Sequence, residues 1–170
     1  MKATLYLGLI LGLVPFQMTV LELVRIGPVR PDLCLVAAVL VGVCAGELEG
    51  LLMGLALGFV QDLFSAGDAW VNLGLKGAAG MIAGLTGRHV ANATPVTILT
   101  LMGGLSAASG LVVVLRGREP LGVGALTVYG PAWLGQAVWE ALICAGLYWL
   151  IAGRVRLERV TPEGWPVFWR

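Results

Sequence analysis

The segment Gly50–Gly84 reads GLLMGLALGFVQDLFSAGDAWVNLGLKGAAGMIAG, and it decides the class of protein. It is apolar and spaced by glycines, with the charged residues Asp62 and Lys76 set inside it. Glycines at helical spacing in an apolar stretch are typical of helices that pack against each other in lipid. The segment therefore predicts a membrane-embedded helix bundle.

The composition of the whole chain points the same way. Of its 170 residues, 58% are hydrophobic and 12% are charged, and the mean hydropathy is +0.90. Too few polar residues remain to cover a globule in water, so we expect the bilayer to be the solvent. The net charge is +1 without a long basic run, which disfavours a nucleic-acid partner because phosphate binding needs clustered Lys and Arg.

The apolar residues fall into six segments that could each form a membrane helix. We place them at Ala3–Val24, Leu33–Gly46, Gly50–Phe64, Val71–Gly87, Thr94–Leu115 and Ala132–Gly153. One long helix over residues 33–64 is the alternative to the second and third. That helix would bury Glu47 and Glu49 in lipid, at about 2.5 kcal/mol or more each. We therefore predict a tight turn between the two segments.

Helix starts are marked by capping residues and prolines. Asp32 is expected to cap the second segment, Asn92 or Thr94 followed by Pro95 the fifth, and Gly130 with Pro131 the sixth. The longest predicted connection, over residues 116–131, is rich in glycine and is expected outside the cytoplasm.

The predicted domains are a six-span transmembrane domain over residues 1–153 and a basic, aromatic tail over residues 154–170. Arginines and tryptophans in the tail favour an interfacial anchor, and a docking peptide for a partner is the alternative. The arginines after the last segment, together with Arg88, favour both termini in the cytoplasm.

Small residues line single faces of the predicted helices. Gly42, Gly46, Gly50, Gly54 and Gly58 recur every four residues, and Gly77, Gly80, Gly84 and Gly87 recur every three or four. Such stripes let backbones approach closely. We expect them to pack inside the bundle; a stripe left open for a neighbouring membrane protein is the alternative.

Ionisable groups in an apolar helix need a partner, because a lone charge in lipid is costly. Asp62 lies near the end of the third segment, and Lys76 lies about one and a half turns into the fourth. Antiparallel helices would bring them to similar depth, so we predict an ion pair between them. The alternative is that Lys76 extends to the headgroups.

The last segment carries a polar stripe of Trp133, Gln136 and Glu140, which faces inward or toward a partner. No catalytic constellation accompanies it, and the carboxylates are scattered. The three cysteines, Cys34, Cys44 and Cys144, lack the spacing of a zinc site or a disulfide framework. We therefore expect neither an enzyme nor a cofactor or metal.

Several motifs resemble the rod shape-determining protein MreD family. They are Pro31-Asp32-Leu33, the run from Gly50 through Gly58 to Phe59, Gln61-Asp62-Leu63-Phe64-Ser65, and the helix with Gly80 and Gly84. The resemblance covers chiefly residues 31–84, about a third of the chain. A Pro-Leu-Gly turn expected before the fourth segment is replaced by Asp68-Ala69-Trp70-Val71-Asn72. No functional residue is transferred beyond Thr94.

The resemblance implies a non-catalytic component of the bacterial cell-elongation machinery in the inner membrane. It would bind MreC and, through it, the RodA glycosyltransferase and a class B penicillin-binding transpeptidase. The family is also similar in architecture to substrate-binding subunits of energy-coupling-factor vitamin transporters, which gives a rival function. An ion or proton carrier using Glu140 is a third.

The residues that we expect to serve helix packing or partner binding come from these stripes and ionisable groups. They are Gly50, Gly54, Gly58, Asp62, Lys76, Gly80, Gly84, Gln136 and Glu140.

Overall fold

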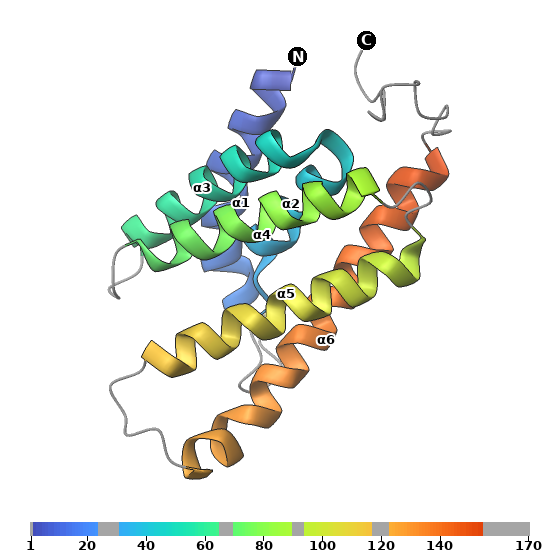
Figure 1. Cartoon of the computed structure of the whole chain (residues 1–170). Helices are drawn as coiled ribbons and strands as arrows, with labels where there is room; N and C mark the ends of the chain where they lie inside the picture. Colours follow the sequence, from blue (N-terminus) through green and yellow to red (C-terminus); the bar gives the residue numbers. More distant parts are fainter. Residues whose placement is uncertain (1, 24–30, 65–69, 90–93, 117–122, 155–170) are drawn as a thin grey trace.

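The computed structural model describes residues 2–23, 31–64, 70–89, 94–116 and 123–154. These residues form six helices and no strand, which confirms the all-helical prediction (Figure 1). The helices are α1 (Lys2–Leu23), α2 (Leu33–Ala45), α3 (Glu47–Phe64), α4 (Val71–His89), α5 (Pro95–Arg116) and α6 (Val123–Arg154). The predicted tail over residues 154–170 lies, apart from Arg154, outside the described residues.

Two of the described helices are long and apolar enough to cross a membrane. Their apolar windows are Pro95–Val112 in α5 and Gly130–Ile151 in α6. The apolar stretches Tyr6–Gln17 and Leu33–Ala45, in α1 and α2, are shorter. By length and composition, therefore, the structure supports two membrane-spanning helices out of the six predicted.

Helix α2 is the hub of the bundle, since it contacts each of the other five helices. Helices α3 and α4 run side by side, and α5 pairs with α6 (Figure 1). The two groups meet in a core of α2, α4, α5 and α6 side chains that includes Val39, Ala83, Met102 and Cys144. A second core lies where α1 covers α2 and α3, around Val14, Cys34 and Leu57.

The turn between α2 and α3 occupies one residue, Gly46. This confirms the tight turn predicted between the second and third segments. Its φ of 106° lies in the left-handed region, which glycine adopts without the steric cost that a Cβ imposes. Glu47 and Glu49 lie in the first turn of α3, where the helix dipole favours negative charge. Helix α3 therefore starts three residues before the predicted Gly50.

Two of the predicted helix starts are confirmed and one is wrong. The Asp32 side chain accepts hydrogen bonds from the amides of Cys34 and Leu35, and the Thr94 hydroxyl accepts one from the Thr97 amide. Helix α6, however, begins at Val123 and runs through Pro131. The predicted connection over 116–131 is correspondingly shorter, because a proline inside a helix can kink it without ending it.

The glycine stripes of α3 and α4 face each other. A Cβ on Gly54 would collide with the Lys76 carbonyl, and one on Gly50 with the Gly80 carbonyl. A Cβ on Gly58 would meet the backbone of Asn72, and one on Gly84 the backbone of Glu47. These positions bring the two helix backbones into direct contact, so they are not open to a neighbouring protein.

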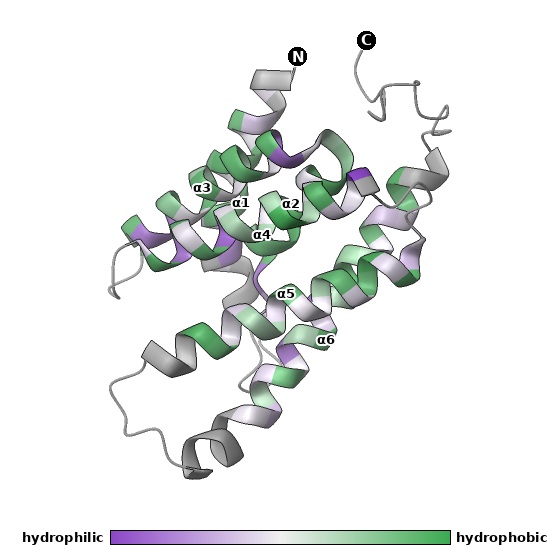
Figure 2. Ribbon diagram, in the orientation of Figure 1, coloured by the Kyte–Doolittle hydropathy of each residue, from purple (hydrophilic) through white to green (hydrophobic). Residues whose placement is uncertain are grey.

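Hydrophobic residues predominate along the described helices (Figure 2). Large exposed hydrophobic side chains occur on α1, α3, α4, α5 and α6, including Leu11, Leu63, Ile82, Val96 and Trp149. A surface of this kind marks contact with lipid or with other proteins rather than with water.

Candidate functional site

A buried polar cluster forms around Lys76 of α4. Lys76 is 2% exposed, and its Nζ lies 2.7 Å from Asp32 Oδ2 and donates a hydrogen bond of 3.0 Å to Asn72 Oδ1. The other Asp32 oxygen accepts from the backbone at the start of α2 and, at 3.3 Å, from Gln17 Nε2 of α1. A single aspartate therefore caps α2, neutralises a buried ammonium and binds α1.

The predicted ion pair between Asp62 and Lys76 is wrong. Asp62 Oδ1 accepts a hydrogen bond of 2.8 Å from Asn72 Nδ2, and Oδ2 accepts one of 3.0 Å from the Leu73 amide. Asp62 thus binds the free amides at the start of α4, and these amides compete with Lys76 for its negative charge. Asn72 bridges Asp62 to Lys76. The alternative, Lys76 extending to the headgroups, is also wrong, because this side chain is buried.

Replacing Asp62 by alanine should therefore act on the start of α4. We expect the free energy of unfolding to fall by about 1–2 kcal/mol, the usual cost of losing a helix cap. Chemical denaturation in detergent micelles, followed by circular dichroism, measures this loss. Reversing both Asp62 and Lys76 should not restore stability, and a restored double variant would contradict the assignment.

Glu140 of α6 completes the cluster from the other side. It is 0% exposed, and its Oε1 accepts from the Asp32 amide at 2.7 Å and from Gln136 Nε2 at 2.8 Å. Ser106 of α5, also buried, approaches the same carboxyl group. It does not satisfy Oε2, which has no hydrogen-bond partner among the described residues.

The polar stripe of α6 therefore faces inward. Gln136 and Glu140 point to the cluster, and the indole of Trp133 packs where a Cβ on Gly110 of α5 would lie. The Trp133 Nε1 is buried and finds no acceptor in the described part of the chain.

The buried polar cluster joins all six helices of the described structure. Its members are Gln17 of α1, Asp32 before α2, Asp62 of α3, Asn72 and Lys76 of α4, Ser106 of α5, and Gln136 and Glu140 of α6. It holds three carboxyl groups and one ammonium. No group of three or more His, Cys, Asp or Glu in the described ranges could hold a metal ion.

Sequence reasoning found half of this cluster. Asp62, Lys76, Gln136 and Glu140 are brought together, whereas the glycine positions lie at the α3–α4 interface beside it. It missed the roles of Gln17, Asn72 and Ser106, and gave Asp32 only a capping role. An isolated amide in the apolar stretch of α1 is a usable signal, because a polar group inside a membrane helix is costly without a partner.

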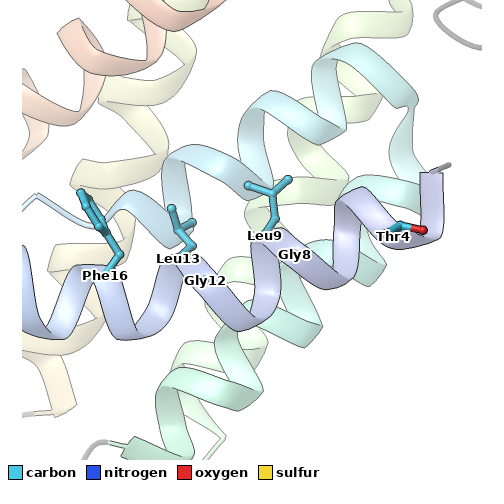
Figure 3. Close-up of a pocket in the computed structure, with 6 residues that line it drawn as sticks. All are labelled: Thr4, Gly8, Leu9, Gly12, Leu13 and Phe16. Atoms are coloured by element: carbon cyan, nitrogen blue, oxygen red, sulfur yellow. The ribbon is translucent and has the colours of Figure 1, made fainter.

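Two apolar hollows lie away from the cluster. One, of about 330 Å³, lies between α1, α2 and α6, with Leu9, Ala37 and Leu147 among its lining residues. The other, of about 530 Å³, follows one side of α1 from Thr4 to Phe16 (Figure 3). Gly8 and Gly12 lie in it with open space where a Cβ would be.

Comparison with known protein families, curated proteins and solved structures gives no match. The fold and the site define the class by themselves. It is an all-helical protein with two helices able to cross a membrane and a buried polar cluster that joins its six described helices.

Proposed function

We propose that the protein is a non-catalytic scaffold of the bacterial cell-elongation machinery in the inner membrane. In this role it binds MreC and links to the RodA glycosyltransferase and a class B penicillin-binding transpeptidase. The proposal rests on the resemblance over residues 31–84 to the MreD family. The observation that carries it further is that the charged side chains Lys76 and Asp32 bind each other inside the bundle, while large apolar side chains are exposed for contacts with proteins and lipids.

A multi-pass arrangement with all six helices in the membrane is part of the proposal. Helices α3 and α4, of 18 and 19 residues, are about 27 and 29 Å long, close to the roughly 30 Å of a hydrocarbon core. Helix α2 has 13 residues and is about 20 Å long, but the other five helices surround it. Short helices are tolerated at membrane depth where protein covers their ends.

The proposal also has both termini in the cytoplasm. The start of α1 and the end of α6 lie at the same end of the bundle in Figure 1. Arg88 and Glu47, at the end of α4 and the start of α3, form an exposed ion pair with a separation of 3.1 Å. An ion pair of this kind suits the headgroup region.

The rival function, a substrate-binding subunit of a vitamin transporter, needs a pocket with free polar groups for a polar solute. The two hollows described above are lined almost entirely by apolar side chains. Lys76 and Asp32, the paired charges of the cluster, are instead bound to each other. This favours the scaffold over the transporter subunit.

Co-expression with MreC from the same genome tests the proposal. We expect MreC to co-elute in constant proportion in a mild detergent, and the synthase pair to be retained only when MreC is present. An unrelated six-helix membrane protein with the same affinity tag is the control for adsorption. Recovery without MreC, but with a stoichiometric small solute and an ATPase module, would establish the rival function.

A further inference from the structure

The hydrogen bonds of Glu140 are unevenly divided between its two oxygens. Oε1 accepts two bonds, from the Asp32 amide at 2.7 Å and from Gln136 Nε2 at 2.8 Å. Oε2 is equally buried and accepts none from the described residues. An ionised carboxylate spreads its charge over both oxygens and needs donors at each, whereas a neutral carboxylic acid has one carbonyl oxygen and one hydroxyl group. No described donor compensates a negative charge on Oε2, so the pattern favours the neutral acid over the carboxylate.

The charges near Glu140 do not compensate an anion there. The nearest described cation in the cluster, Lys76, is bound to Asp32 at 2.7 Å and to Asn72 at 3.0 Å. Asp32 itself adds a second negative charge beside Glu140. The remaining neighbours, Gln136 on α6 and Ser106 on α5, are uncharged. Burying an unpaired carboxylate costs several kcal/mol, and a bound proton removes that cost.

We propose that Glu140 holds an exchangeable proton on Oε2, which makes the buried polar cluster a proton-binding site. Oε1 is then the carbonyl oxygen that accepts both N–H groups. Oε2 then carries the hydroxyl group, which makes no hydrogen bond to a described residue. The proton comes from a hydronium ion of bulk water, whose O–H bond breaks as the Oε2–H bond forms, and it adds one positive charge to the cluster. This site is independent of MreC binding.

Infrared spectroscopy of the protein in phosphatidylglycerol and phosphatidylethanolamine vesicles tests the proposal, with the spectrum of each variant subtracted from that of the wild type. The carbonyl stretch of a neutral carboxylic acid is separate from the bands of a carboxylate. At pH 7 we expect this band in the wild-type protein, its shift in deuterated water, and its complete loss in Glu140→Gln. Glutamine has nearly the same shape and keeps the oxygen that accepts both N–H groups, so this variant should fold.

Glu47→Gln is the matched control, because Glu47 is paired with Arg88 at the end of the bundle and should give no such band. The proposal fails if the wild-type protein lacks the band at pH 7 or if Glu140→Gln retains it. It also fails if added sodium at constant pH abolishes the band, since the ligand would then be a metal cation.

Discussion

Replacing Lys76 by methionine should lower the free energy of unfolding by about 3–5 kcal/mol, because it leaves the Asp32 carboxylate without its counter-charge. The ammonium is 2% exposed and lies 2.7 Å from Asp32 Oδ2. Methionine keeps the length of the side chain, so the loss reports on charge more than on packing. Thermal and denaturant unfolding in detergent micelles, followed by circular dichroism, measure it.

Two further variants show whether the loss comes from the buried pair. Arg88→Met breaks the other ion pair, in which the side chains of Arg88 and Glu47 are 50% and 25% exposed, and should cost no more than about 1 kcal/mol. Adding Asp32→Asn to Lys76→Met removes the orphaned charge and should recover part of the stability. If the Lys76 and Arg88 variants lost the same free energy of unfolding, the buried pair would not stabilise the fold more than the exposed one does.

Replacing Gly54 by alanine should lower the free energy of unfolding by about 1–3 kcal/mol, the usual cost of overpacking. The added methyl group would meet the Lys76 carbonyl oxygen and carbon, and a backbone cannot move aside as the end of a side chain can. Helices α3 and α4 must then separate, and the Asp62–Asn72 contact between them should weaken too. The same unfolding measurements detect this loss.

Gly74→Ala is the matched control on the same helix pair. Gly74 lies in α4, and nothing occupies the 4 Å around the position of its Cβ. Since alanine favours a helix by about 1 kcal/mol over glycine, this variant should be as stable as the wild type or more so. If both alanine variants behave alike, close approach of the backbones at Gly54 does not hold α3 to α4.

Local signals in the sequence predicted much of the fold. The bounds of α2 follow from Asp32 and Gly46, and the start of α5 follows from the Thr94-Pro95 pair, because the effects of these residues act within a few positions of the chain. The start of α6 could not be predicted this way. Glycines and Pro131 signal a loop by their local preference, and whether a helix continues through them depends on packing that is not local.

The site was harder to predict than the fold because its contacts join distant residues. Lys76 pairs with Asp32, 44 positions earlier, and Glu140 binds the Asp32 amide from 108 positions away. The similar depth expected for Asp62 and Lys76 in the membrane made Asp62 as good a partner for Lys76 as Asp32. The choice depends on the start of α4, where free amides attract Asp62, and on α2, whose position against α4 and α6 brings Asp32 to the ammonium.

The length of α6 has a consequence for how far the protein reaches from the membrane. The helix has 32 residues, about 48 Å, but its apolar window covers only the 22 residues Gly130–Ile151. With that window centred in a bilayer, residues 123–129 continue the helix for roughly 10 Å beyond the hydrocarbon at one end. The first two turns of α6 therefore lie clear of the lipid tails, where water or another protein can contact them.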